Sequence, residues 1–269
     1  MSAIAAVVFD WAGTVIDFGC LAPVEALLAG FKDEGVAITE AQARRDMGRA
    51  KRDHVRALLG IAEVRTQWTA RHGHEPDEAD VSRLHDALEP LMRAATAAHS
   101  ELIPGAAALA ASLAARGVKI GSSTGYTRTM MADILPRAAA QGYAPSVVVC
   151  AGETPEGRPS PLPMWKNLIE LAAWPASRCV KVDDAEVGIA EGRAAGAWTI
   201  GIAASGNGVG LSLAAWQALG ESERQRRADA AMAALRSAGA DYVAHTVADL
   251  APVLAQIEQR IANGERPGS

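Results

Sequence analysis

The sequence predicts an α/β fold with a parallel sheet, and three observations support this prediction. Beyond residue 100, short apolar runs alternate with alanine-rich helical stretches, an order typical of βαβ units. The first 20 residues hold a similar apolar run, whereas residues 22–99 contain only an amphipathic helical pattern. At 269 residues the chain can hold one large α/β domain with a smaller insert. We therefore expect a sheet domain interrupted by a helical region.

The individual elements follow from the apolar runs and the residues that end them. The runs expected as strands are Ala5–Phe9, Val118–Ser122, Ser146–Cys150, Cys179–Val182 and Trp198–Ile202, with Asp241–Ala244 as a short edge strand. Helices are expected over Ala106–Arg116, ended by Gly117, and from near Arg128 and Val247. The helical region is broken near residues 35–38, 60–61 and 73–76. Residues 205–225 are longer than an ordinary βα loop, so we expect them beside the ligand site.

Composition narrows the classes of function. The chain has 26 basic and 31 acidic residues, a net charge of −5, which argues against nucleic-acid binding. No apolar run approaches the roughly 20 residues of a membrane span, so no membrane partner is expected. The start of the chain lacks a signal-peptide pattern, and three scattered cysteines suit neither a disulfide framework nor a zinc site. We expect a cytoplasmic protein.

The end of the first apolar run carries the most informative motif. Asp10 follows the run directly, where open α/β sheets place their ligands. The motif Asp10-Trp11-Ala12-Gly13-Thr14-Val15 is close to the D-x-D-G-T-[LV] signature of haloacid dehalogenase-like phosphotransferases. That resemblance implies that Asp10 is a nucleophile toward phosphorus. The second Asp of the signature, a general acid for an oxygen leaving group, is here Ala12. An enzyme of this kind must activate its leaving group in another way.

Two further segments make the resemblance more specific. Together with the Asp10 motif, Asp17-Phe18-Gly19-Cys20 and Met47-Gly48-Arg49-Ala50-Lys51-Arg52-Asp53-His54 resemble the corresponding segments of phosphonoacetaldehyde hydrolases (phosphonatases). This family belongs to the haloacid dehalogenase-like superfamily. The resemblance implies a Rossmann-like parallel sheet flanked by helices, with an inserted all-helical C1-type cap domain. Residues 1–20 and 100–269 would form the catalytic core, and residues 21–99 the cap.

The resemblance also implies a magnesium site. Its ligands would be the Asp10 carboxylate, the backbone carbonyl of Ala12 and Asp184, all oxygen donors of the kind Mg²⁺ prefers. Asp183 replaces the usual Gly of the family's Gly-Asp-Thr-x-x-Asp motif, and Gly188 stands where an outer Asp can lie. The outer-sphere ligand is therefore left open, with Asp183 as a partial substitute. A pair of solvated loop acids is the alternative interpretation.

Donors for the phosphonate oxygens are expected at two places. The turn Gly121-Ser122-Ser123-Thr124-Gly125-Tyr126-Thr127 joins a strand to a helix, a geometry suited to anions. The family resemblance implies that Thr124, with Gly125, binds the substrate; simple helix capping by Thr124 or Thr127 is the alternative. Gly157-Arg158-Pro159 resembles the family's Gly-Arg-Pro element and makes Arg158 the charge-neutralising group. Without that resemblance Arg158 would be read as a surface residue.

Lys51 is expected to form a Schiff base with the substrate aldehyde. The attacking group must be a neutral amine, so burial and nearby cations must lower its pKa from about 10.4. Electrons of the breaking P–C bond would then flow into the iminium, and no acid at position 12 is required. His54 and Met47 lie three residues after and four before Lys51, so we expect them on one helical face. His54 could move protons and Met47 could touch the substrate; a surface histidine and core packing are the alternatives.

The leading prediction is an Mg²⁺-dependent hydrolase that converts phosphonoacetaldehyde to acetaldehyde and phosphate, in the degradation of 2-aminoethylphosphonate. One alternative is a phosphatase or phosphomutase of the same superfamily, which the absence of an acid at Ala12 disfavours. Another is a catalytically silent member that binds phosphorylated ligands or a partner. The resemblance further implies a homodimer joined through the cap. Cys20 and Tyr126 are expected near the site, in structural roles, and the base that activates the hydrolytic water is left open.

Overall fold

The core of the molecule is a six-stranded, all-parallel sheet. The structure is a computed structural model that describes residues 2–268. The strands are β1 (Ala6–Phe9), β2 (Lys119–Ser123), β3 (Val147–Val149), β4 (Cys179–Asp183), β5 (Trp198–Ile202) and β6 (Tyr242–Ala244). They lie in the order β3-β2-β1-β4-β5-β6. All six predicted strands are confirmed to within two residues at either end, including β6 as a three-residue strand at the edge.

Helices cover both faces of the sheet, and β1 shows why. Along β1 the side chains alternate: Ala6 and Val8 pack toward one face, and Val7 and Phe9 toward the other. Both sets are buried, as the continuous apolar run requires. One face is covered by α9 (Leu162–Glu170), α10 (Glu186–Ala195) and α12 (Glu221–Ser237). The opposite face is covered by α6 (Ala106–Ala115) and α13 (Leu250–Ala262).

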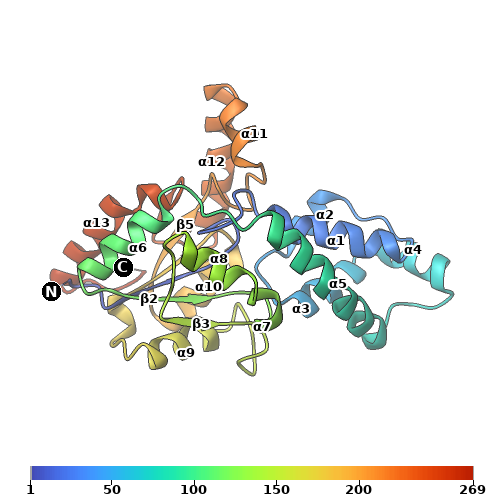
Figure 1. Ribbon diagram of the computed structural model, residues 1–269, viewed down its shortest axis with the longest axis horizontal. Helices are drawn as coiled ribbons and strands as arrows, with labels where there is room; N and C mark the ends of the chain where they lie inside the picture. Colours follow the sequence, from blue (N-terminus) through green and yellow to red (C-terminus); the bar gives the residue numbers. More distant parts are fainter. Residues whose placement is uncertain (1, 269) are drawn as a thin grey trace.

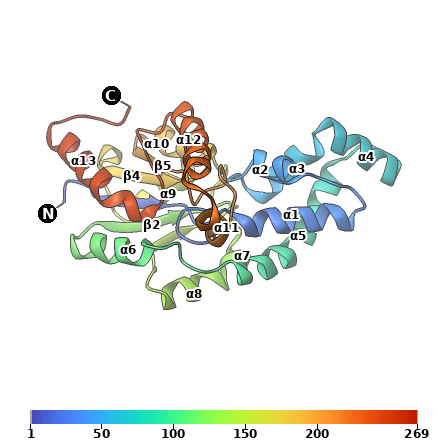
Figure 2. The ribbon, with the colours of Figure 1, turned by 90° about the horizontal axis from the view of Figure 1, so that it is seen from above.

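Between β1 and β2 the chain forms an all-helical cap of residues 21–98, which lies beside the sheet rather than on either face (Figures 1 and 2). Its helices are α1 (Leu21–Asp33), α2 (Glu40–Arg45), α3 (Lys51–Leu59), α4 (Ala62–His72) and α5 (Glu78–Ala98). It has apolar residues of its own that are fully buried, among them Phe31, Trp68 and Leu84. The inserted helical cap of the predicted fold class is therefore present. Among residues 2–268, every helix is too short or too polar to cross a membrane.

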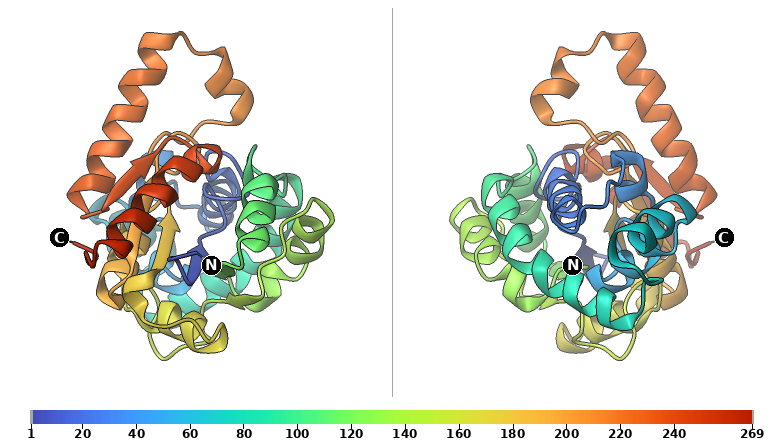
Figure 3. Two further views of the ribbon diagram at one scale, coloured as in Figure 1. Left: turned by 90° about the vertical axis from the view of Figure 1, so that its left-hand side faces the viewer. Right: turned by 90° about the vertical axis from the view of Figure 1, so that its right-hand side faces the viewer.

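Two details of the predicted pattern are wrong. Met47 does not continue a helix into Lys51, because α2 ends at Arg45 and the chain turns through Gly48, whose φ is +90°. Residues 205–225 are not one long loop. After a loop over residues 203–212, Ser212 caps α11 (Leu213–Ala218) by accepting a hydrogen bond from the amide of Ala215. With α12 this helix forms a hairpin that projects from the body of the molecule (Figure 3).

The remaining elements are short. They are α7 (Arg128–Met131), α8 (Ile134–Ala140) and the 3₁₀ turns Ala176–Arg178 and Val247–Asp249. The helix expected from near Arg128 is thus a single turn. The helix expected over 106–116 ends one residue early and is followed by Gly117 in a left-handed conformation, as its position after the helix predicts. These elements leave the carboxyl ends of β1, β2 and β4 facing the cap.

Candidate active site

The parallel sheet brings the predicted core residues to one edge. Phe9 pairs with Ser122 on one side and with Val182 on the other. The residues that follow these three therefore lie at the same level along the edge of the sheet. The amide of Asp10 donates a hydrogen bond to the carbonyl of Val182 at 2.9 Å. Asp10 and the two acids after Val182 therefore lie side by side at the edge that the cap covers.

A small cavity of about 20 Å³ lies between this edge and the cap. That volume holds about one water molecule. Its lining contains eight of the nine predicted site residues, namely Asp10, Ala12, Met47, Lys51, Thr124, Gly125, Arg158 and Asp184, together with Cys20, Pro23, Gly48 and Tyr126. His54 lies outside the lining. Residues from the cap and from the core thus meet around one small space.

Arg158 is a buried cation set among carboxylates. Its Nη1 atom lies 2.8 Å from Oδ1 of Asp10 and 3.3 Å from Oδ2 of Asp183. Its Nε atom lies 3.2 Å from Oε2 of Glu191. All four side chains are less than a tenth exposed. A buried charge must be paired to be tolerated, so these carboxylates fix the guanidinium in contact with Asp10. The interpretation of Arg158 as a surface residue is wrong.

The sequence did not point to a second buried cation, Lys181. Its Nζ atom lies 3.1 Å from Oδ2 of Asp183 and 2.9 Å from Oε2 of Glu191 and donates to Oγ of Ser123 at 2.7 Å. The sequence does contain a signal for this pair. Lys181 and Asp183 are two residues apart on one strand, so their side chains lie on the same face. Gly192 on α10 provides the room, because a Cβ atom there would lie 2.6 Å from Cβ of Lys181.

Three carboxylates form the candidate metal centre. Ligand oxygens of Asp10, Asp183 and Asp184 lie within 4.8 Å of one another, and all three residues are buried. Burial, followed by the charge of Asp183, raises the pKa of Asp10 to about 6 against the opposing effect of Arg158. Burial and the charges of Asp10 and Asp183 raise the pKa of Asp184 well above its usual value. Crowded carboxylates that resist ionisation fit a hard divalent cation.

The neighbours of Asp184 support the same assignment. Its Oδ2 atom accepts a hydrogen bond from the amide of Asn207 at 2.7 Å, while the two buried cations contact the other acids. A Cβ atom at Gly13 would lie 2.3 Å from that oxygen, so only glycine leaves room for the carboxylate. Asp184 is thus held in place but not neutralised. The carbonyl donor expected from Ala12 belongs to a residue of the same cavity lining.

The departure at Asp183 and Gly188 has a steric explanation. A Cβ atom at Gly188 would lie 2.0 Å from Cγ of Asp183, so the Asp183 carboxylate fills the space that a side chain at 188 would need. Asp183 Oδ1 also accepts a hydrogen bond from the amide of Ala185 at 3.0 Å. An acid at 183 and a glycine at 188 therefore accompany one another. The interpretation of Asp183 and Asp184 as solvated loop acids is wrong.

Lys51 is the first residue of α3 and is only 2% exposed. Its Nζ atom lies 3.9 Å from Sδ of Met47 and 5.5 Å from the centre of the Tyr126 ring. Met47 therefore contacts Lys51 through a turn and not along a helix face. Burial lowers the pKa of Lys51 to about 8, although the nearby acidic groups oppose this. A lysine of this kind is partly a neutral amine near neutral pH.

His54 lies in the same helix, three residues after Lys51, and is fully buried. Burial, followed by the positive charge of Lys51, lowers its pKa to about 3. Its imidazole is therefore neutral at physiological pH, and the interpretation as a surface histidine is wrong.

The turn after β2 contains two threonines with different roles: one caps a helix and the other lines the cavity. Thr127 caps α7, its hydroxyl accepting from the amide of Met130, whereas Thr124 lines the cavity and accepts from the amide of Tyr126 at 3.2 Å. A Cβ atom at Gly125 would lie 2.5 Å from the carbonyl oxygen of Arg49, so this glycine lets the cap loop approach. Burial raises the pKa of the Tyr126 phenol and of the Cys20 thiol well above their usual values.

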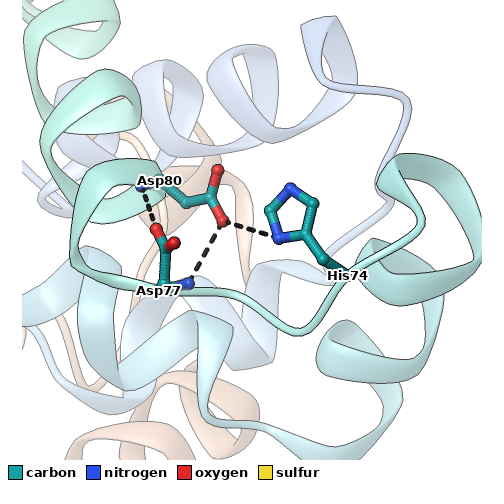
Figure 4. A group of neighbouring side chains, drawn as sticks. All are labelled: His74, Asp77 and Asp80. Atoms are coloured by element: carbon teal, nitrogen blue, oxygen red, sulfur yellow. Dashed lines mark hydrogen bonds and ion pairs between the residues drawn. The ribbon is translucent and has the colours of Figure 1, made fainter.

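A second group of possible ligands lies in the cap and is explained by helix capping. His74, Asp77 and Asp80 approach one another at the start of α5 (Figure 4). Asp77 accepts from the amides of Ala79 and Asp80, and Asp80 accepts from the amide of Asp77 at 3.1 Å. This reciprocal pattern is a capping box. Because His74 and Asp77 are exposed, this group is a poorer metal site than the buried acids.

A wider cleft of about 620 Å³ adjoins the small cavity, and Met47 and Asp184 line both. It separates α2 of the cap from α12 and from the loops after β4 and β5. Three arginines of the cap, Arg44, Arg45 and Arg49, contribute to its wall. The cleft therefore places positive charge beside the buried Asp184.

Comparison with known proteins agrees with this arrangement. Residues 4–196 match the model of the haloacid dehalogenase-like hydrolase family. A phosphonoacetaldehyde hydrolase of Paraburkholderia xenovorans (strain LB400) is 48% identical over 267 residues, which cover 99% of this chain and 100% of that protein. One from Nitratidesulfovibrio vulgaris (strain DSM 19637 / Miyazaki F) is 42% identical, with coverage of 97% and 94%.

A crystal structure from Oleispira antarctica, described as a phosphonoacetaldehyde hydrolase-like protein, agrees over almost the whole molecule. Its TM-score is 0.97 at 43% sequence identity, covering 98% of this chain and 96% of that one. Both the cap and the core are included in that coverage. The chain therefore belongs to the phosphonoacetaldehyde hydrolase family, within the haloacid dehalogenase-like hydrolases.

Proposed function

We propose that this protein cleaves the P–C bond of phosphonoacetaldehyde and releases acetaldehyde and phosphate. The observation that carries the proposal is the meeting of Lys51 and Asp10 at one small cavity where position 12 is an alanine. A lysine amine can bind an aldehyde covalently, and a carboxylate can accept a phosphoryl group. The names and full-length similarity of the relatives support this choice of substrate.

The first step is assigned to Lys51. Its neutral Nζ attacks the aldehyde carbon, water leaves, and a protonated imine forms. The pKa of about 8 makes a fraction of this amine available at neutral pH. His54, a neutral imidazole one turn along α3, is proposed to relay the proton that moves during this step, once loss of the Lys51 charge removes one of the causes that lower its pKa. Met47 and Tyr126, which both lie close to the amine, are proposed to shield it from water.

The second step is assigned to Asp10. Its carboxylate attacks phosphorus, the P–C bond breaks, and the bonding electrons enter the iminium to give an enamine on Lys51. The products of this step are an aspartyl phosphate and an enamine, so no proton donor is needed at Ala12. Arg158, 2.8 Å from Asp10, is proposed to offset the negative charge of the phosphonate. Thr124 and Gly125 are proposed to bind its oxygens.

The last steps restore both residues. Protonation of the enamine carbon regenerates an imine, and water hydrolyses it to acetaldehyde and free Lys51. A second water hydrolyses the aspartyl phosphate to phosphate and free Asp10. Water must reach both centres, so the cap must open during the cycle.

A magnesium ion is proposed as the cofactor. The groups that would hold it are the carboxylates of Asp10 and Asp184 and the carbonyl of Ala12, with Asp183 beside them. When bound, the ion supplies positive charge that screens the phosphonate from its attacking carboxylate. Three buried carboxylates that crowd one another support a divalent cation at this place. Their oxygen-only donor set favours Mg²⁺ over zinc.

Residues 1–20 and 100–269 are proposed as the catalytic core and residues 21–99 as the cap domain. The break between strands and helices at these positions supports the division. A homodimer joined through the cap and a cytoplasmic location are also proposed, and both rest on the family resemblance. Light scattering on a purified sample measures the first.

One assay tests the proposed activity. Purified protein with Mg²⁺ should release acetaldehyde and phosphate in equal amounts from phosphonoacetaldehyde, and EDTA should stop both. A phosphate monoester of similar size serves as the control, because its alkoxide leaving group would need the acid that Ala12 does not provide. Turnover of the monoester but not of the phosphonate would favour a phosphatase instead. No turnover of either would favour a silent binding protein.

A further inference from the structure

Arg44, at the end of α2, joins the cap to two core loops. Its side chain is only 13% exposed. Nη1 donates to the carbonyl of Gly19 at 3.0 Å and to Oδ1 of Asn207 at 3.1 Å, and Nη2 donates to the carbonyl of Gly210 at 3.1 Å. Nε is paired with Glu40 of the same helix at 2.8 Å. One cap side chain therefore contacts the chain just before the cap begins and the loop that follows β5.

Asn207 completes the connection to the buried acids. Its Nδ2 donates to the backbone carbonyl of Arg44 at 3.0 Å, so the two residues bond in both directions. Its backbone amide donates to Oδ2 of Asp184 at 2.7 Å. The path from the cap to the candidate metal ligand thus consists of one side chain and one loop residue.

The backbone around this contact is shaped for it. Gly210 has a φ of +68°, and a Cβ atom there would lie 2.8 Å from Cζ of Arg44. Gly206 lies against Asp184: a Cβ atom at Gly206 would lie 2.7 Å from Cβ of Asp184. The loop can hold both the guanidinium and the carboxylate because these two positions are glycines.

The small volume of the cavity between cap and core gives the Arg44 contact a consequence. At about 20 Å³ the cavity is too small for a phosphonoaldehyde, so the cap must move away from the core to make room for the substrate. Cap opening must separate Arg44 from Asn207 and Gly210. The same movement removes the group that holds the Asn207 amide against Asp184.

We propose that Arg44 is a positioning residue that latches the closed cap and, through Asn207, holds Asp184 in place for the metal. Metal binding and cap closure then favour each other, because both need the same arrangement of the 203–210 loop. The inference rests on the proposed role of Asp184 as a metal ligand, but not on the identity of the substrate.

Two measurements that use no substrate test the latch. The first is the dissociation constant of Mg²⁺, by calorimetry, for the wild type and Arg44→Gln. We expect about tenfold weaker binding in the variant, the lower end of the usual loss when an outer-shell partner is removed. The second is amide hydrogen exchange in the metal-free protein. Peptides that cover residues 203–210 should exchange faster in Arg44→Gln, whereas those of β4 should not.

Arg45→Gln is the matched control, since this neighbour is 56% exposed and, within residues 2–268, pairs only with the adjacent Asp46. It should leave both measurements within twofold of the wild type. Asn207→Ala tests the path: combined with Arg44→Gln it should weaken Mg²⁺ binding little more than either change alone. Additive losses, or Mg²⁺ binding and loop exchange unchanged in Arg44→Gln, would overturn the proposal.

Arg44→Lys keeps the measurement possible if the glutamine variant does not fold. An ammonium keeps the charge but cannot hold three separated acceptors with one planar group, so Mg²⁺ binding should still weaken. Binding equal to the wild type would overturn the latch. Because neither measurement involves phosphonoacetaldehyde, failure of the proposed activity and failure of the latch would be told apart.

Discussion

Nη1 of Arg158 lies 2.8 Å from Oδ1 of Asp10, and Glu191 lies 3.2 Å from the other side of the same guanidinium. Glu191 thus holds Arg158 in place while Arg158 contacts Asp10. The contact orients Asp10 and favours its ionised form, although burial still raises the pKa of this carboxyl to about 6. An acid arranged in this way, at the end of a buried strand, is suited to nucleophilic attack.

Asp10→Asn should therefore abolish turnover without unfolding the protein. An amide keeps the shape but is no nucleophile toward phosphorus, so kcat should fall by roughly 10⁴-fold or more, as for other catalytic residues. Steady-state kinetics on the purified variant measure this, with circular dichroism to check the fold. Turnover within tenfold of the wild type would exclude Asp10 as the nucleophile.

The rate should rise with pH through the titration of Lys51. The reactive amine is the deprotonated form, which predominates above the pKa of about 8. Below that value kcat/KM should fall about tenfold per pH unit, and above it the profile should level off. A profile measured between pH 6 and 9.5 tests this. A flat profile across pH 7 to 8.5 would contradict a rate-limiting amine at Lys51.

Magnesium should stabilise the protein more at pH 7.5 than at pH 5. The folded-state pKa of Asp10, about 6, is above its ordinary 3.8. Stability is therefore lost as the pH rises from about 4 to about 6, where the unfolded chain ionises Asp10 more readily than the folded one, and at pH 5 protons compete with the metal. The rise in Tm on adding Mg²⁺, measured at both pH values, tests this.

The same measurement separates the two neighbouring acids. Asp184→Asn should remove the rise in Tm, whereas Asp183→Asn should keep more of it, because Asp183 is already paired with Lys181 and Arg158. A larger loss in Asp183→Asn would show that the ligand assignment is reversed.

Gly188→Ala should destabilise the fold even though alanine favours helices. The added Cβ would lie 2.0 Å from Cγ of Asp183 and would displace that buried carboxylate, at a cost of about 1–3 kcal/mol. Gly220→Ala is the control, since its φ is −65° and nothing lies within 4 Å of the added atom. Thermal unfolding compares the two, and equal Tm values for both variants would refute the steric argument.

Much of the fold was predictable because it depends on local patterns. Short apolar runs that alternate with helical stretches favour buried strands of a parallel sheet, and all six predicted strands were found. The helix pair α11–α12 was missed, because no residue of α11 is buried and α12 buries only part of one face against the body. Met47 was predicted on the helix of Lys51 because a spacing of four residues fits one helical face, whereas the chain turns at Gly48 between them.

The site was predictable where a motif carries the chemistry and not where tertiary packing does. Asp10, Lys51 and Asp184 each follow from a short segment. Lys181 and Glu191 are 10 residues apart on a strand and a helix, and only the packing of α10 on β4 makes them partners. Arg44 resembles any helix-terminal arginine, and its contacts with Gly19, Asn207 and Gly210 depend on the closed cap.

The central claim is that Lys51 forms an imine with the substrate. Borohydride reduces an imine to a stable secondary amine, so reduction in the presence of phosphonoacetaldehyde or acetaldehyde should inactivate the enzyme. Lys51→Arg is the matched variant: its guanidinium stays protonated, so it should bind phosphonate, form no adduct and fail to cleave. Lys166, which is partly exposed and paired with Glu170, is the internal control for non-specific labelling.

Peptide mass spectrometry after borohydride reduction reads the result directly. The account predicts added mass on the peptide that contains Lys51, in step with the loss of activity, and none on the peptide that contains Lys166. Inactivation with the label on another lysine, or full activity after reduction with substrate, would contradict it.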